Sequence, residues 1–181
     1  MPDTALGITY PASTGHARIW EHLQALAEDV DALLTKPPTG SASSTTTQTT
    51  TSTSETVSLT ISNMLFKSGW AYRASIRTAV YGTTGALAFF RLRKTNASGT
   101  DYGELGRVAC EGTVTGSAAM ANGSLILVRS AGTDLTTNVA LTTSTNTGTI
   151  NLFASASSPR YLLIEPIGKA SDYAGLGVDV T

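Results

Sequence analysis

The sequence predicts a mainly β protein in which one helix precedes an antiparallel β-sandwich, jelly-roll-like or of another Greek-key type. From residue 57 onward, apolar and polar residues alternate within short segments that turn-forming residues separate, which is typical of a sandwich. Residues 13–35 carry apolar residues at steps of three and four, the spacing of a coiled-coil helix. Between them, fourteen of the eighteen residues 39–56 are Ser or Thr. We therefore expect four segments: an extended anchor peptide (1–12), a coiled-coil helix (13–35), a Thr/Ser-rich stalk (36–56) and a β head (57–181).

The first twelve residues, MPDTALGITYPA, are too short and too interrupted by proline and glycine for a helix. Leu6, Ile8 and Tyr10 alternate with other residues, the pattern of an extended peptide that lays one face on another surface. A frayed terminus is the alternative. We expect these three side chains to attach the chain to a larger assembly.

The helix predicted over residues 13–35 has a seam of apolar side chains. Ser13 or Thr14 can cap its start, and Pro37 and Pro38 cannot continue it. Eight residues occupy heptad positions a, d and e: Ile19, Trp20, Leu23, Leu26, Ala27, Val30, Leu33 and Leu34. Leu at position a with Leu or Ile at d favours more than two strands, and an apolar e position widens the buried face. We predict a parallel homotrimer. An amphipathic helix packed on its own domain is the alternative, because three heptads are few.

The tract over residues 39–56 contains no large apolar residue. Such a tract cannot bury enough apolar surface to offset the entropy of ordering, but threonine has good strand propensity. We expect extended chains held by their neighbours, which form a stalk between the helix and the β head.

The β head begins at residue 57, and its clearest strand pattern lies in residues 70–81. There six residues alternate with the rest: Trp70, Tyr72, Ala74, Ile76, Thr78 and Val80. Further strand candidates are residues 57–62, 86–95, 105–111, 124–130, 139–143, 149–156 and 161–167. Turn residues such as those of 82–85, 96–99, 122–123 and 146–148 separate them. This regular series without intervening helices predicts the sandwich.

Charge and composition exclude several classes of function. Residues 1–35 contain one arginine and five acidic residues, whereas residues 57–181 contain ten basic and seven acidic residues. Neither part has the strongly basic balance of a nucleic-acid-binding protein. No apolar run approaches the roughly 20 residues of a membrane span, and the start lacks the basic and apolar segments of a signal peptide. Cys110 is the single cysteine, so we expect a soluble protein without an internal disulfide.

No catalytic constellation stands out in the sequence. His16 and His22 are the two histidines, at helix positions a and g. Three His16 side chains could surround an ion on a trimer axis, but a stacked or water-bonded imidazole is favoured. Without a histidine, the β head cannot hold a Ser-His-Asp or Cys-His site. Asp101, Glu104 and Glu111 are near enough in sequence for a glycosidase carboxylate pair, but solvated carboxylates are favoured. We expect no enzyme activity, no cofactor and no metal.

Two weaker patterns concern basic and aromatic residues of the β head. Five cations are candidates for a basic stripe across two neighbouring strands: Arg73, Arg77, Arg91, Arg93 and Lys94. A solvated face that discourages edge pairing is favoured over an anionic ligand site. Four aromatic residues are predicted to lie in the core rather than to form a sugar platform: Trp70, Phe89, Phe90 and Tyr161.

Three parts of the chain form a recognisable pattern. They are residues 7–11 (GITYP) followed by Trp20, Leu23 and residues 26–31 (LAEDVD), then residues 90–100 (FRLRKTNASGT) and residues 159–168 (PRYLLIEPIG). These parts resemble small tail-fibre and head-fibre proteins of phages that infect actinobacteria. The last part is similar to a PR-x-L-x-VEDIG segment of those proteins, with Pro166 in place of the acidic residue. The resemblance implies a virion-surface protein and supplies no catalytic residue.

From the residues and the resemblance together, we predict a homotrimeric phage protein on the virion surface, attached to a capsid protein by its N-terminal peptide and made in the host cytoplasm. The chain is short for a tail fibre, which favours a capsid decoration or head fibre. The alternatives are a tail fibre or a receptor-binding module for a host cell-surface glycan, which needs exposed aromatic residues in a groove, and an enzyme, which needs paired carboxylates in a cleft.

Overall fold

The structure is a computed structural model of the chain, and it describes residues 17–34 and 36–181. The chain divides into two units, Met1–Pro37 and Pro38–Thr181, and each is described by itself. The first unit contains helix α1 (Ala17–Leu34), where the heptad pattern predicts a helix. The side chain of Gln24 donates a 2.9 Å hydrogen bond to Glu28 one turn later. The anchor residues Leu6, Ile8 and Tyr10 lie outside the described residues, as do the cap candidates and His16.

The second unit contains the strands and two short 3-10 helices, η1 (Thr115–Ser117) and η2 (Ala170–Tyr173). The strands of the described residues are β1 (Gly40–Ser44), β2 (Gln48–Thr50), β3 (Thr56–Phe66), β4 (Trp70–Gly82), β5 (Leu87–Lys94), β6 (Asp101–Ala109), β7 (Ala119–Arg129), β8 (Leu135–Thr145), β9 (Ile150–Phe153), β10 (Arg160–Lys169) and β11 (Val178–Asp179).

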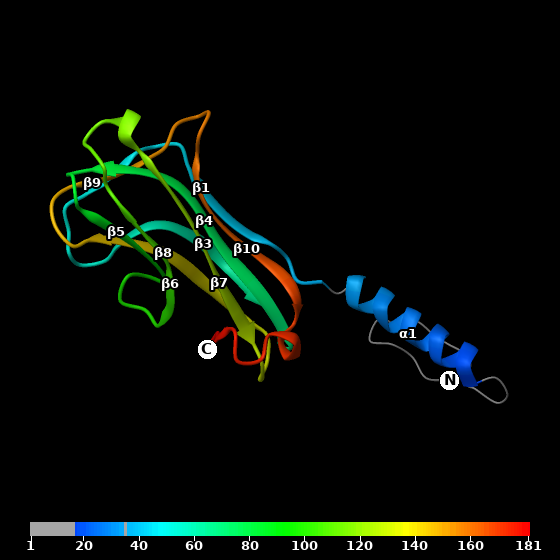
Figure 1. The fold of residues 1–181 in the computed structure, drawn as a ribbon. Coiled ribbons are helices and arrows are strands. Elements are labelled where there is room, and N and C mark those ends of the chain that lie inside the picture. Colours follow the sequence, from blue (N-terminus) through cyan, green and yellow to red (C-terminus); the bar gives the residue numbers. More distant parts are fainter. Residues whose placement is uncertain (1–16, 35) are drawn as a thin grey trace. The chain divides into compact units, whose positions relative to one another are not determined.

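These strands form two sheets that face each other (Figure 1). The larger sheet has the order β1-β10-β4-β7-β11, and β9 pairs with β4 and β2 beside this path. The smaller sheet has the order β3-β8-β5-β6. Every neighbouring pair is antiparallel except β11 and β7, which run parallel.

The strand order is that of a jelly roll. Strands β9 and β10 form one interrupted strand, because both pair antiparallel with consecutive parts of β4, and β1 and β2 line their other edge. With β1/β2 counted as the first strand and β9/β10 as the eighth, the orders become 1-8-3-6 and 2-7-4-5. Eight strands arranged as two Greek keys define a jelly roll. The predicted sandwich is confirmed, and the topology selects the jelly roll from the two alternatives.

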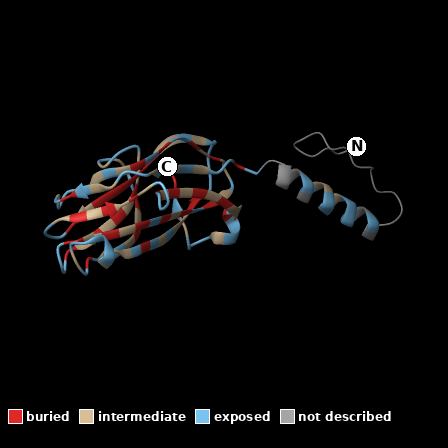
Figure 2. Cartoon of the chain, turned by 90° about the horizontal axis from the view of Figure 1, so that it is seen from above, coloured by how far each residue is buried: buried red, intermediate tan, exposed pale blue. Residues whose placement is uncertain are grey.

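Strand β4 shows how the sequence directs side chains into the core. Its alternating set is buried as predicted, apart from the half-buried Trp70 at its start, while Arg73 and Arg77 on the opposite parity are exposed. The Phe66 and Tyr72 rings meet edge to face with centroids 5.0 Å apart. Figure 2 shows buried residues alternating with more exposed ones along the strands. The core therefore lies between the two sheets, and the outer faces are left for other roles.

A bulge in β3 keeps both halves of that strand on the core. Its buried apolar residues fall on both parities: Leu59, Ile61, Met64 and Phe66. The register with β8 shifts between Ile61 and Met64, and one extra residue at this point reverses the parity. Asn63 occupies the bulge with φ of 53°, a left-handed conformation that asparagine tolerates.

The Ser/Thr-rich tract belongs to the sandwich, so the expected stalk over residues 36–56 is wrong. Strand β1 pairs with β10 along its whole length, and β2 pairs with β9. Between them, the buried Arg160 donates from Nη1 to the Thr46 carbonyl at 2.8 Å. Small polar side chains suffice here because the tract obtains its hydrogen bonds through the backbone, while apolar residues of neighbouring strands supply the core. The second unit begins at Pro38 rather than at residue 57.

Candidate functional site

The predicted trimerisation seam lies on α1, and four of its five described side chains are exposed. Four seam residues have between 38% and 63% of their surface exposed: Val30, Leu23, Leu26 and Ile19. Ala27 is half-buried. The side chains of three further seam residues lie outside the description: Trp20, Leu33 and Leu34. An isolated helix of this length is marginal in water and needs packing of its apolar face, so this seam is a candidate surface for self-association. The coiled coil and the trimer stay predictions.

The predicted basic stripe is wrong, because its residues lie on two different sheets. Arg73 and Arg77 are on β4 in the larger sheet, whereas Arg91 and Arg93 are on β5 in the smaller sheet. The two pairs therefore face solvent on opposite sides of the sandwich. Arg73 pairs with Glu165 of β10 through Nη2 at 2.5 Å. The alternation of residues predicts which side chains of a strand face outward, but it does not predict which sheet the strand joins.

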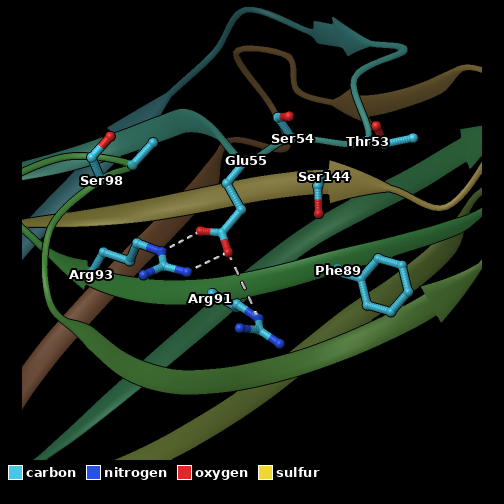
Figure 3. A pocket seen from close by; sticks show the side chains of 9 residues that line it. Thr53, Ser54, Glu55, Phe89, Arg91, Arg93, Ser98 and Ser144 are labelled. Carbon is cyan, nitrogen blue, oxygen red and sulfur yellow. Dashed lines mark hydrogen bonds and ion pairs between the residues drawn. The ribbon is translucent and has the colours of Figure 1, made fainter.

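An open hollow of about 620 Å³ lies on the outer face of the smaller sheet (Figure 3), and we call it the outer hollow. Strands β5 and β8 contribute Phe89, Arg91, Arg93 and Ser144. The segment before β3 contributes Thr53, Ser54 and Glu55, and the β5–β6 loop contributes Ala97 and Ser98. The β5 residues point outward because the residues between them, Ala88, Phe90 and Leu92, fill the core. The register places Phe89 opposite Ser144 and Arg91 opposite Thr142.

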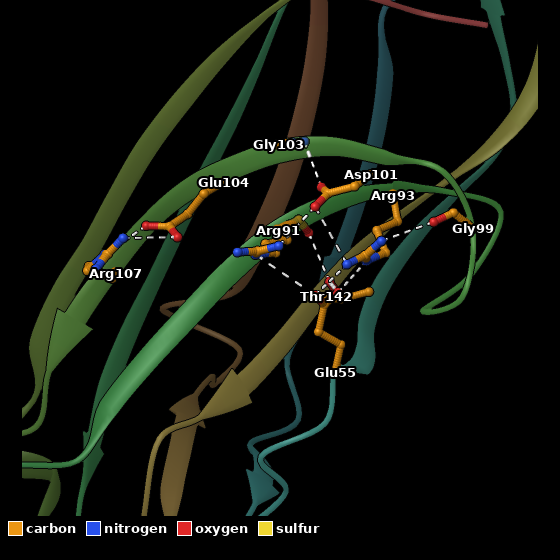
Figure 4. A network of polar contacts seen from close by, with 9 residues as sticks. All are labelled: Glu55, Arg91, Arg93, Gly99, Asp101, Gly103, Glu104, Arg107 and Thr142. Atoms are coloured by element: carbon orange, nitrogen blue, oxygen red, sulfur yellow. Dashed lines mark hydrogen bonds and ion pairs between the residues drawn. The ribbon is translucent and has the colours of Figure 1, made fainter.

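Glu55 is at the centre of an ion-pair network beneath this hollow (Figure 4). Its carboxylate accepts hydrogen bonds from Arg93 at 2.5 Å and 2.7 Å and from the Thr142 hydroxyl at 2.6 Å. Arg91 lies 3.9 Å from the same carboxylate and donates to Asp101 at 2.9 Å. Arg93 also approaches Asp101 at 3.6 Å. The network links the Ser/Thr-rich tract, β5, β6 and β8.

The network shifts the ionisation of both central groups toward their charged forms. Hydrogen bonds from Arg93 lower the pKa of the Glu55 carboxyl, outweighing the upward effect of burial, and Thr142 adds to the lowering. The same hydrogen bonds raise the pKa of Arg93. Both side chains are only 17% exposed, so water screens their attraction less than at an open surface.

Several groups in the outer hollow remain available for a ligand. The Phe89 ring is half-buried on an otherwise polar face, and the guanidinium carbon of Arg107 lies 5.5 Å from its centroid. Four hydroxyls have no hydrogen-bond partner among the described residues: those of Thr53, Ser54, Ser98 and Ser144. The hollow therefore combines an aromatic surface, hydroxyl groups and guanidinium groups.

The carboxylates singled out for hydrolysis lie in other pairings. Asp101 bonds Arg91, Glu104 bonds Arg107 at 2.8 Å, and Glu111 is exposed. Within residues 17–34 and 36–181, no three His, Cys, Asp or Glu side chains gather in a way that could hold a metal ion. No helix in the described ranges is long and apolar enough to span a membrane.

The aromatic prediction holds for Phe90, which is buried, and for Trp70, which packs against the core, but Phe89 faces the outer hollow. Tyr161 is half-buried.

Sequence reasoning missed Glu55 altogether. One feature of the sequence could have identified Glu55: it is the single charged residue among residues 39–56. A lone charge in a neutral tract indicates a position with a specific partner.

Fold and site together define a jelly-roll domain with a polar, aromatic-lined hollow and a separate helical unit. No protein-family model matches the chain, and no curated protein is similar to it in sequence. Among solved structures, the chain is similar to the VP2 subviral particle of infectious bursal disease virus, with a TM-score of 0.43 and 10% identity over 75% of this chain and 39% of that chain. It is also similar to T=1 particles derived from the same virus, with a TM-score of 0.45 and 9% identity over 75% of this chain and 37% of that one.

The chain thus spans less than two fifths of the length of each of these two matched chains.

Proposed function

We propose that the chain is a structural protein of a phage virion surface, a homotrimeric capsid decoration or head fibre that attaches by its N-terminal peptide and displays the jelly-roll domain. The observation that carries the proposal is the uncovered apolar seam of α1, with Ile19 and Leu26 exposed by 63% and 59%. Apolar side chains at strict heptad spacing match a second and third copy of the same helix.

The division of the chain into two units supports a display role. The helix belongs to Met1–Pro37 and the sandwich to Pro38–Thr181, so self-association can be assigned to one unit and display to the other. Jelly rolls occur in viral capsid and lectin domains, but a fold alone does not decide a function. The resemblance of residues 7–31, 90–100 and 159–168 to phage fibre proteins supplies the virion context.

Trimerisation would strengthen the proposed attachment through Leu6, Ile8 and Tyr10. Three anchor peptides held together by one helical bundle bind as a unit, so weak individual contacts gain from a high effective concentration. The capsid is the proposed position, and the tail fibre is its alternative.

Immunogold labelling of particles of the encoding phage tests the proposal. We expect antibodies against the jelly-roll domain to decorate the capsid of intact particles. Labelling confined to the tail would identify the tail-fibre alternative, and particles free of the protein would overturn the virion role.

Adding purified protein to particles that lack it, with and without residues 1–12, tests the anchor. The truncated protein should trimerise but fail to sediment with the particles.

A further inference from the structure

We propose that the outer hollow binds an acidic saccharide, with the Phe89 ring as its stacking surface and the Arg91 guanidinium as the partner of a sugar carboxylate. This assignment goes beyond a structural role on the virion. It concerns the outer face of one jelly-roll domain and is independent of the oligomeric state. The volume of the outer hollow, about 620 Å³, lies within the range of about 300 to 1,000 Å³ that small-molecule sites occupy.

The groups that face the hollow have the chemistry of a sugar site. A sugar ring presents apolar C–H groups on its faces and hydroxyl groups around its edge. Phe89 offers an apolar ring beside the free hydroxyl of Ser144 on the adjacent strand. The Arg107 guanidinium, 5.5 Å from the ring centroid, covers one face of this ring, so a sugar would stack on the other face. Thr53 and Ser54 place two more free hydroxyls at the opposite side of the hollow (Figure 3). A hydroxyl both donates and accepts hydrogen bonds, so each can pair with a sugar hydroxyl in either direction.

Charge in the hollow favours an acidic sugar over a neutral one. Its lining contains two arginines and one glutamate. The Glu55 carboxylate is already satisfied by Arg93 and Thr142 and is 17% exposed. Arg91 is 40% exposed. Asp101, the partner of Arg91, is 36% exposed and lies outside the lining. The lining itself, with two arginines and one glutamate, therefore carries one net positive charge.

Arg91 also retains hydrogen-bonding capacity. Its Nη1 donates to Asp101, whereas its Nη2 makes no hydrogen bond or ion pair with any described residue, and its Nε is 3.9 Å from Glu55. Arg93, by contrast, uses Nε and Nη2 on Glu55 and Nη1 on the Gly99 carbonyl. Because a guanidinium edge matches a carboxylate in a bidentate pair, Arg91 is the residue of the hollow that can bind one.

The ion-pair network holds this arrangement in place before a ligand arrives. Asp101 fixes one end of the Arg91 guanidinium, and its other oxygen accepts the Gly103 N–H at 2.8 Å. Glu55 ties the segment that carries Thr53 and Ser54 to β5 (Figure 4). A site whose side chains are already ordered loses less entropy on binding.

Calorimetric titration of the full chain with oligogalacturonate and oligoglucuronate tests the proposal, with a neutral galactose oligomer and citrate as comparison ligands. We expect saturable binding of at least one acidic oligomer. The neutral oligomer should bind about ten-fold more weakly, because it lacks the charged hydrogen bond. Citrate, which offers carboxylates without a sugar ring, should also bind at least about ten-fold more weakly.

Two variants and one matched control locate the site. Phe89→Ala and Arg91→Gln should each weaken binding about ten-fold or more. Arg73→Gln removes an exposed, ion-paired arginine from the other sheet and should leave binding unchanged. Arg91→Lys keeps the charge but loses the bidentate geometry, and it should bind with intermediate affinity. Unchanged thermal midpoints show that each variant is folded.

Three results would overturn the assignment. They are the absence of binding for both acidic oligomers at millimolar concentration, equal affinity for citrate and the oligomers, and wild-type affinity in the Phe89→Ala and Arg91→Gln variants. None of them bears on the virion role. A trimeric virion protein that binds no saccharide would support the proposed function and contradict the saccharide site. A monomer that binds the acidic oligomers would support the saccharide site and contradict the trimer.

Discussion

The Glu55 carboxylate accepts hydrogen bonds from two nitrogen atoms of Arg93, at 2.5 Å and 2.7 Å, although 38 residues separate them in the chain. Glu55 lies in the Ser/Thr-rich tract and Arg93 in the middle of the smaller sheet. This ion pair links the Ser/Thr-rich tract to strand β5 on the outer face of the smaller sheet. It therefore bears on both the stability of the sandwich and the shape of the outer hollow.

Replacing Glu55 with glutamine should destabilise the sandwich. Both partners are 17% exposed, and hydrogen bonds to charged groups contribute about 1.5 to 3 kcal/mol. We expect the free energy of unfolding to fall by about that amount in urea titrations. Glu165→Gln is the matched control, because its partner Arg73 is 53% exposed and such pairs contribute about 0 to 1 kcal/mol. Equal losses in the two variants would contradict the special role of Glu55.

The stabilising effect of Glu55 should depend on pH. Arg93 holds the pKa of this carboxyl below its ordinary value in the folded protein, so the folded state binds the proton more weakly than the unfolded chain. The contribution is complete above the pKa of glutamate in the unfolded chain, about 4.3, and is lost as pH falls through the lower folded value. The difference in free energy of unfolding between wild type and Glu55→Gln should therefore shrink between pH 7 and about pH 3. A difference that stays constant would contradict this mechanism.

Shortening the Ser/Thr-rich tract should weaken the sandwich, unlike the shortening of a linker. Deleting residues 41–46 removes most of β1 and the Thr46 carbonyl that Arg160 binds. Because buried polar groups are left unpaired, we expect a loss of about 3 kcal/mol or more, and a fall in Tm of about 10 °C. Deleting residues 17–22 is the control, because they belong to the other unit. A Tm that stays within a degree or two of wild type would restore the stalk interpretation.

The oligomeric state should depend on the seam of α1. Replacing Leu26 and Val30 with aspartate places charges among apolar side chains, where an unpaired charge costs several kcal/mol. We expect a shift toward the monomer in sedimentation velocity. Leu176→Asp adds one aspartate at a residue of the sandwich that is 71% exposed and should leave the oligomeric state unchanged. Loss of the oligomer in both variants would show that the effect is not specific to the helix.

The sequence predicted features that depend on local periodicity and missed those that depend on pairing partners. Alternation in residues 70–81 identified β4 and its buried face, and the heptad identified α1. The tract of residues 39–56 was misassigned because the partners that order it, β9 and β10, follow about a hundred residues later. The bulge at Asn63 and the placement of Asp101 opposite Arg93 are likewise set by register.

Light scattering of the purified full-length protein tests the central claim most directly, because a trimer is the premise of both display and anchoring. We expect a molar mass of three times the 18.7 kDa of the chain at micromolar concentration. A mass of 18.7 kDa under the same conditions would contradict the trimer, and would leave the exposed seam of α1 without a partner in copies of its own chain.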